Sequence, residues 1–421
     1  MFLDGAERTD AMKRTGADDG ATGSEPDADL APTAAGGTEA VRSSPSGRRA
    51  AARRRGAAAL ARRLGLVMVG PEALSWSRRR SGRGFVYLDG EGRPIRDPAV
   101  KARLVALAVP PAYVAVGYAP DPNAHLQAIG RDAEGRQQYR YHALWEEVRE
   151  RLKADRLARL ATALPRIRRR IVRDLAAAPG ERRLALAAVV ELVTQTAIRP
   201  GGESYAREHG TRGAATLLKS DLRRVGGRVE LRFRAKGDKA VVCPVTDDRL
   251  AGVLAALAEL PGRRLFQYRG EDGTPRPVAS GEVNAYLREI AGTAVSLKDF
   301  RTLVASAGVL HALAGVEPET SERRRNAQVA KAIREAAEVL RNTPAICRRS
   351  YLLPAVVRAF EDGTLARFAR RLKRCRSAVR RAEVLAGLIR HARHHDRPPE
   401  PPRAAKSATR GRRRGPAGSG A

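Results

Sequence analysis

The sequence predicts a multidomain α+β protein. It should have a small strand-rich N-terminal domain, a mainly α-helical domain with an inserted β-hairpin, and disordered tails. Short alternating apolar stretches come before residue 154, and apolar residues recur every three to four positions after 155. Both ends are rich in Ala, Gly, Pro and charged residues. The 421 residues should divide into a tail at 1–63, domains at 64–154 and 155–365, and a basic tail at 366–421.

The N-terminal tail changes character along its length. Residues 1–40 hold nine acidic and three basic residues without apolar periodicity, which predicts disorder. Residues 41–63 are basic and read RSSPSGRRAAARRRG in their central part. Such a segment is either a short arm that lies on phosphates or a solvated tail.

The first domain contains several strand signals. Residues 84–95, GFVYLDGEGRPI, predict a strand, a DG turn and a second strand. Residues 112–119, AYVAVGYA, predict another strand after a pair of prolines. A polar-aromatic strand at 137–142 follows an EG turn and leads into a helix.

The second domain is predicted to be mostly helical. Helical periodicity covers residues 157–178 and 182–198. The stretch RVELRFRA–KGDK–AVVCPV, within 228–245, interrupts it with the alternation of a half-buried hairpin. Ser296 and Asp299 match a capping box, so a helix should begin at about Leu297.

The C-terminal segment is predicted to be a basic tail. Residues 366–421 hold 17 basic and 3 acidic residues, a net charge of +14. Their first half can form one amphipathic helix, and the end is rich in Pro, Arg and Gly. Such a tail should bind DNA without reading its sequence.

Charge narrows the class of partner. Lys and Arg number 79 against 46 acidic residues, giving a net charge of +33, which favours nucleic acid as the partner. We find neither an apolar run of 18 residues nor a secretory signal, so we expect a cytoplasmic, nucleoid-associated protein. Three cysteines without a CxxC pair fit a reducing compartment and argue against a structural zinc site. Charge alone does not separate an enzyme from a DNA-packaging protein.

Lysine is rare in this chain. Ten of the 79 basic residues are lysine and 69 are arginine. Lysine can release a proton where arginine does not, so lysines inside motifs are candidates for proton transfer. Two of the ten, Lys236 and Lys298, lie in such motifs.

Cutting a phosphodiester requires an oriented nucleophile, positive donors on its oxygens and an acid for the leaving group. No carboxylate motif of the metal-dependent kind stands out, so the sequence predicts no metal cofactor. Arg199 follows a helix and precedes two glycines, Lys236 lies at the hairpin tip, and Arg301 lies near a helix N-terminus beside Lys298. Tyr351 follows in RNTPAICRRSYLLPAV. Taken separately, each also fits a solvated or structural side chain.

In this order the motifs resemble the catalytic region of bacterial and poxvirus type IB DNA topoisomerases, from about residue 75 to 365. The stretches that carry the resemblance are HLQAIGRDAEGRQQYRYH, RPGGESYA, FRAKGDK, LKDFRT and RNTPAICRRSY. The resemblance implies that Tyr351 is the nucleophile of a 3′-phosphotyrosyl link and that Arg199 and Arg301 bracket the phosphate. It also implies that Lys236 is the general acid, with Lys298 as its helper.

The resemblance extends to DNA contacts and contains one departure. It implies that Tyr205, and Gln138, Tyr139 and Tyr141 in the first domain, face duplex DNA, which a monomer would clamp. The poxvirus enzymes have a histidine nine residues before the nucleophile, where this chain has Asn342. An amide can donate the same hydrogen bond without charge. The bond to the phosphate oxygen should therefore be weaker by about 1 kcal/mol, and the enzyme correspondingly less active.

Two alternatives remain open from the sequence. A tyrosine recombinase shares this chemistry, but usually has histidine at the position of Lys298 and a helical N-terminal half. A non-enzymatic basic DNA-binding protein explains the charge but leaves the ordered motifs unexplained.

Overall fold

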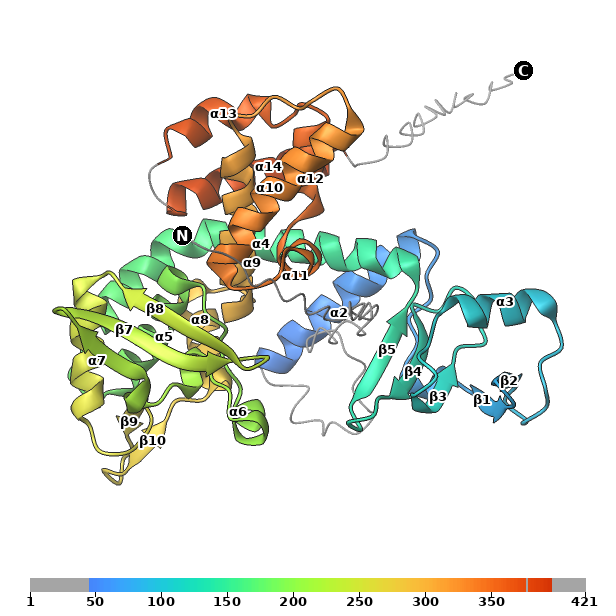
Figure 1. Ribbon diagram of the computed structural model, residues 1–421, viewed down its shortest axis with the longest axis horizontal. Helices are drawn as coiled ribbons and strands as arrows, with labels where there is room; N and C mark the ends of the chain where they lie inside the picture. Colours follow the sequence, from blue (N-terminus) through green and yellow to red (C-terminus); the bar gives the residue numbers. More distant parts are fainter. Residues whose placement is uncertain (1–44, 376–377, 396–421) are drawn as a thin grey trace, which may run out of the picture. The chain divides into compact units, whose positions relative to one another are not determined.

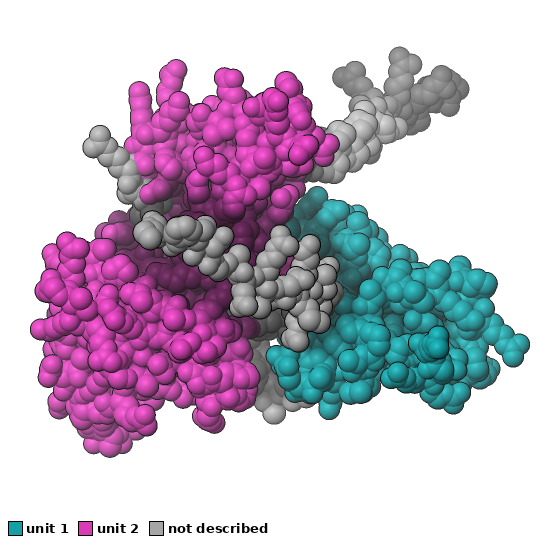
Figure 2. Space-filling view, in the orientation of Figure 1, with its two compact units in different colours: residues 1–152 teal, residues 153–421 magenta. Residues whose placement is uncertain are grey.

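The computed structural model describes residues 45–375 and 378–395, which form two compact units. The division falls between Leu152 and Lys153, within the long helix α4 (Ala143–Asp174) (Figure 2). Together the units confirm the predicted fold class, with strands prominent in the first and helices in the second (Figure 1). Among the described residues, no helix has the length and apolar character that crossing a membrane requires.

Unit 1 is built on one antiparallel sheet in the order β2-β1-β3-β4-β5. Its strands are β1 (Trp76–Ser81), β2 (Gly84–Leu88), β3 (Val114–Tyr118), β4 (Leu126–Arg131) and β5 (Gln137–Tyr141). Its helices are α2 (Pro45–Arg63), the short η1 (Pro71–Ala73), α3 (Pro98–Ala106) and the first part of α4. Small clusters of buried side chains cover both faces of the sheet.

The hairpin predicted for residues 84–95 is wrong in its second half. β2 pairs with β1, which the sequence did not single out, and the segment after the turn makes only one bridge, Leu88 to Pro94. Proline lacks the amide that a continuing ladder needs. The DG turn is present, but it returns the chain toward helix α3.

Unit 2 is mainly helical around a three-stranded sheet, as Figure 1 shows. The sheet consists of β6 (Leu222–Val225), β7 (Arg228–Ala235) and β8 (Lys239–Val245), and it confirms the predicted hairpin. A small ribbon adds β9 (Gln267–Arg269) and β10 (Pro275–Pro277). The first helices are α5 (Arg182–Thr196), α6 (Glu203–His209), the short η2 (Ala214–Thr216) and η3 (Lys219–Asp221), α7 (Asp248–Glu259) and α8 (Ser280–Ala291).

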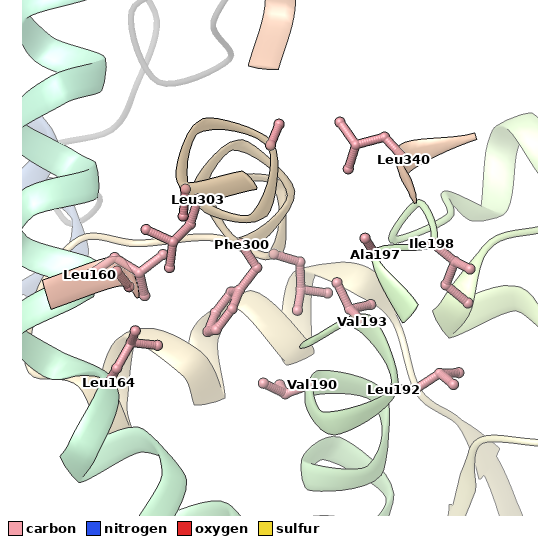
Figure 3. Packing of buried hydrophobic residues seen from close by; sticks show 14 of the residues in the cluster. Leu160, Leu164, Val190, Leu192, Val193, Ala197, Ile198, Phe300, Leu303 and Leu340 are labelled. Atoms are coloured by element: carbon pink, nitrogen blue, oxygen red, sulfur yellow. The ribbon is translucent and has the colours of Figure 1, made fainter. Parts of the chain in front are cut away.

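The later helices surround α9 (Leu297–Leu313), which begins at the predicted capping box. They are α10 (Glu322–Leu340), α11 (Pro344–Ile346), the π-helical turn η4 (Cys347–Tyr351), α12 (Pro354–Glu361), α13 (Ala366–Lys373) and α14 (Ala378–His395). Figure 3 shows Phe300 of α9 in the core, between Leu160 and Leu164 of α4 and Val190 and Val193 of α5. This packing fixes the first turns of α9 and therefore the residues beside Phe300.

The predicted N-terminal tail is wrong for residues 45–63, and residues 1–44 lie outside the described part. Helix α2 buries Ala57 and Ala61, one turn apart, against Trp145 and Val148 of α4. Alanine carries a weak hydrophobic signal, and the surrounding arginines concealed this stripe in the sequence. Small side chains nevertheless allow one helix to pack closely on another.

The helix expected in the first half of the C-terminal segment is present as α14, preceded by the shorter α13, but the boundary of the tail at residue 366 is wrong, because α14 belongs to the folded unit. Residues 376–377 and 396–421 lie outside the described part. Helix α14 packs against α9 and buries Leu385, Leu388 and Ile389. Arginines flank an apolar stripe here, so the basic composition concealed that this amphipathic helix is part of the core.

We expect the substitution Leu385→Ala to lower the free energy of unfolding by about 2–5 kcal/mol, because it removes a fully buried side chain. Denaturant unfolding measures this change. The control Arg390→Ala, on the exposed side of the same helix, should change it by about 0.5 kcal/mol or less. Equal effects of the two substitutions would show that α14 is not part of the core.

Candidate active site

Tyr351 ends the π-helical turn η4, in which the Leu352 amide donates to the Cys347 carbonyl at 3.1 Å. π-Helical turns are rare in proteins, and those that occur are often found at functional sites. The buried Ser306 hydroxyl of α9 donates to the Tyr351 carbonyl at 3.0 Å and accepts from the Leu353 amide at 3.1 Å. The half-buried Tyr351 thus has its backbone fixed to the core helix.

Arg301 is only 1% exposed and lies in the second turn of α9, directly after the core residue Phe300. Its guanidinium carbon lies 4.9 Å from the centre of the Tyr351 ring. Its Nη2 donates to the Leu340 carbonyl at 3.1 Å, and its Nη1 donates to the Ala197 carbonyl. The side chain therefore connects the ends of α5 and α10 to the turn that carries Tyr351.

The electrostatic surroundings of Arg301 are unusual for a buried cation. Burial is the largest influence and lowers the pKa of its guanidinium, while the nearby Tyr351 raises it. Among the described residues, no carboxylate forms an ion pair with it, and its Nε lacks a hydrogen-bond partner. An arginine remains charged even so, and a buried charge without a counter-ion is costly. An anion beside Tyr351 would offset that cost.

Arg199 lies in the loop after α5, at the point where the chain leaves the left-handed C-cap Ala197. Its Nη2 donates to the Oδ1 of Asn342, which lies two residues beyond the end of α10. This contact fixes the orientation of the amide, because the opposite orientation would place two donors together. The Nδ2 of Asn342 is then buried without a hydrogen-bond partner among the described residues. A donor is thereby held ready next to Arg199.

The loop that carries Arg199 is tightly enclosed. The Ala214 amide donates to the Arg199 carbonyl and the Ala215 amide to the Pro200 carbonyl, both at 2.8 Å. A Cβ on Gly213 would lie 2.6 Å from the Arg199 carbonyl oxygen and 2.5 Å from the Gly201 nitrogen. Only glycine therefore fits at position 213 without displacing the loop.

A pocket of about 380 Å³ adjoins these groups, between the α5–α6 loop, the hairpin and the end of α10. No acidic side chain among the described residues lines it, and its basic residues are Arg199, Arg212, Arg301, Arg341 and Lys239. Arg341 holds the left-handed C-cap of α10 and donates to the Thr196 carbonyl at 2.9 Å. The pocket is suited to an anion.

Lys236 lies outside this cluster. It is exposed at the tip of the β7–β8 hairpin, with its Nζ 5.0 Å from the centre of the Tyr205 ring of α6. Tyr205 in turn packs edge-on against His209, with ring centres 4.3 Å apart. The structure thus brings together two predicted site residues, Lys236 and Tyr205, next to the pocket rather than within it.

Lys298 is exposed in the first turn of α9, three residues before Arg301. The neighbouring Asp299 completes the predicted capping box by accepting from the Ser296 amide at 2.8 Å. The backbone carbonyl of Lys298 accepts from the Thr302 hydroxyl at 3.3 Å. Its side chain therefore points toward solvent at the helix start, and its predicted role as a helper stays a prediction.

The three predicted DNA contacts of unit 1 lie on β5, an edge strand, and divide between its two faces. Tyr139 and Tyr141 share one face, stack with ring centres 6.1 Å apart and are partly buried against a core cluster. Gln138 lies on the other face, where its amide donates to Asp132 at 2.9 Å. A single flat surface therefore does not present all three.

Sequence reasoning missed Ser306, Lys153 and Arg341. Ser306 carried a signal, because it is a polar residue within the largely apolar segment LVASAGVLHAL, residues 303–313. Lys153, whose Nζ donates to the Leu352 carbonyl at 2.9 Å, lies 199 residues away from its partner and had no local signal. Arg341 had no local signal either, since nothing in the sequence reveals which carbonyl its side chain contacts.

Comparison with known proteins decides the family. Residues 143–378, more than half of the chain, match the family described as eukaryotic DNA topoisomerase I, catalytic core. The chain belongs to the type IB DNA topoisomerases. Residues 84–132 match the bacterial DNA topoisomerase IB N-terminal domain. The DNA topoisomerase 1B of Acanthamoeba polyphaga mimivirus is 28% identical over 292 residues, which cover 68% of this chain and 87% of that protein.

The family assignment confirms the predicted enzyme class, a DNA topoisomerase, over a tyrosine recombinase or a non-enzymatic basic protein. Within residues 45–375 and 378–395, we find no group of three His, Cys, Asp or Glu side chains placed to hold a metal ion. The roles of the individual site residues in this topoisomerase remain predictions, which the geometry above makes specific.

We expect Gly213→Ala to slow DNA relaxation by this topoisomerase by about tenfold or more, because its Cβ would displace the loop that carries Arg199. A time course on supercoiled plasmid measures the rate. Gly252→Ala is the control, since a Cβ at that site in α7 meets no atom within 4 Å. A Gly213→Ala enzyme as fast as wild type would show that the loop position does not matter.

Proposed function

We propose that this topoisomerase relaxes supercoiled duplex DNA by cutting one strand through Tyr351, which becomes linked to the 3′-phosphate, without ATP or metal. The observation that carries the proposal is the buried guanidinium of Arg301, held 4.9 Å from the ring of Tyr351. A cation in that place stabilises both a phenolate and a phosphate.

In the proposed site, three side chains bind the oxygens of the phosphodiester. Arg199 can present a planar pair of donors, and Arg301 contributes charge from a region of low dielectric, where electrostatic interactions are strong. The Nδ2 of Asn342 supplies a neutral donor, aligned by its partner Arg199. Together they balance the negative charge that grows as the nucleophile attacks.

In the proposed reaction, the Tyr351 oxygen bonds to phosphorus as its hydroxyl proton passes to solvent. The bond between phosphorus and the 5′-oxygen breaks, and Lys236 gives that oxygen a proton, with Lys298 as helper. The phosphotyrosyl bond retains the energy of the original linkage. The 5′-hydroxyl can therefore reverse the reaction after the strand has rotated, and no ATP is required.

Lys236 must approach the phosphate for this role. The tip of its hairpin contains Gly237 and Asp238 with positive φ values of 76° and 53°. At the exposed hairpin tip, Lys236 contacts the ring of Tyr205. We propose that bound DNA, also contacted by Tyr205, replaces this cation–π contact, which at an exposed site contributes only about 0.5–1 kcal/mol.

The proposed substrate is double-stranded DNA, bound by a monomer whose two units serve as the halves of a clamp. In unit 1, the edge strand β5 would contact the duplex on both its faces, through Tyr139 and Tyr141 on one and Gln138 on the other. We place the enzyme in the cytoplasm with the nucleoid, where its substrate is found. The high positive charge predicts binding that weakens steeply with salt.

Tyr351→Phe should abolish relaxation while leaving DNA affinity within about twofold, because it removes only the attacking oxygen. The assay uses supercoiled plasmid with EDTA present and ATP absent, followed by a gel-shift measurement on the same preparation. A relaxing Tyr351→Phe enzyme, or a wild-type enzyme that needs ATP or metal, would overturn the mechanism.

Asn342→Ala should slow strand cleavage by about tenfold, the value of roughly one hydrogen bond to a charged group. Asn342→Asp should be slower still above pH 5. Its carboxylate can accept from Arg199 as the amide oxygen does, but it repels the phosphate. Single-turnover cleavage of a short duplex gives both rates. An Asn342→Asp enzyme as fast as wild type would show that Asn342 serves only to hold Arg199.

A further inference from the structure

Helix α2 lies outside both segments that match the family, residues 84–132 and 143–378. It is nevertheless held firmly in unit 1. Ala57 and Ala61 are completely buried against Trp145 and Val148, and Leu60 and Leu64 pack at the edge of the same cluster. The helix is therefore a fixed addition to the domain, and its outer face has a fixed direction relative to the sheet.

The outer face of α2 is positively charged. The helix contains seven arginines and no acidic residue. At 3.6 residues per turn, Arg55, Arg62 and Arg63 lie on the side opposite Ala57 and Ala61, and all three are exposed. We find no ion pair between these three and any other described residue. Clustered like charges on a helix repel one another, so an external anion bound to this face would relieve that repulsion.

The position of α2 within unit 1 suggests which anion. Its cluster includes Tyr141, which stacks on Trp145 with ring centres 6.1 Å apart. Tyr141 belongs to β5, the strand proposed above to contact the duplex. Arg55 and Arg62 lie about 10 Å apart along the helix axis. Over that length a DNA duplex carries about six phosphate charges.

We propose that Arg55, Arg62 and Arg63 form a second DNA-binding surface, which contacts duplex phosphates without reading sequence. The inference rests on the proposed function, since it assumes that DNA is the substrate bound at β5. It assigns to α2 the role of extending the contact along the duplex and of strengthening binding at low salt, apart from the chemistry at Tyr351.

The test compares two triple variants of the full chain that lose the same charge. The first replaces Arg55, Arg62 and Arg63 with Gln. The control replaces Arg93, Arg183 and Arg276 with Gln, each an exposed arginine that is already paired with a carboxylate. The dissociation constant for a short duplex is measured by fluorescence anisotropy from about 50 to 200 mM salt, and thermal melting checks folding.

The logarithm of affinity falls as the logarithm of salt concentration rises, and loss of three phosphate contacts should make the slope of this dependence less steep by about 3. The ratio of the dissociation constant of the α2 variant to that of wild type should therefore fall by about 40-fold between 50 and 200 mM salt, because each phosphate contact releases about 0.9 counter-ion when it forms. The control slope should stay near that of wild type, and replacement of the three α2 arginines with Lys should retain the wild-type slope.

An α2 variant whose slope equals that of the control would overturn the inference. Covalent complex formation at saturating DNA is followed in the same samples and should be unchanged in both triple variants. If the wild-type chain forms no covalent complex, the proposed function fails, whereas the salt slopes still report on the α2 surface. The two failures are therefore distinguishable.

Discussion

The burial of Arg301 is the constraint on which the site depends. A guanidinium removed from water needs acceptors, and here two backbone carbonyls and the face of an aromatic ring supply them. Those carbonyls belong to Ala197, two residues before Arg199, and Leu340, two residues before Asn342. One side chain thus determines where three elements distant in sequence meet, and the ring beneath it belongs to Tyr351.

The backbone around this arginine supports the same interpretation. Ala197 and Arg341 both have φ values near +50°, which non-glycine residues seldom adopt. Each ends a helix that delivers a site residue, α5 before Arg199 and α10 before Asn342. Strain of this kind persists only where surrounding contacts impose it, and it concentrates at functional sites. The capping contacts from Arg301 and Arg341 to the end of α5 impose it here.

Much of this arrangement could be predicted from the sequence. The capping box at Ser296, the β7–β8 hairpin and the order of the motifs are local features, and each was found where expected. The burial of Arg301 could not be predicted, because the sequence placed it only near a helix N-terminus, beside Lys298. Its acceptors are carbonyls 39 and 104 residues away, which leave no trace in the local sequence.

Composition misled the prediction at both ends of the chain. Helices α2 and α14 use alanine, leucine and isoleucine on one side and arginine on the other, so their average resembles a basic tail. Packing against α4 and α9 makes them part of the fold. Among the arginines that concealed them, Arg55, Arg62, Arg63 and Arg390 are exposed, which suits a protein that acts on DNA.

Identification of the covalent link tests the central claim most directly. The enzyme is incubated with a DNA duplex whose cut strand releases a short end, the complex is denatured and digested, and the modified peptide is sequenced by mass spectrometry. We expect a single modified residue, Tyr351, joined to a 3′-phosphate. A link to another residue or to a 5′-phosphate, or the absence of any link, would contradict the account.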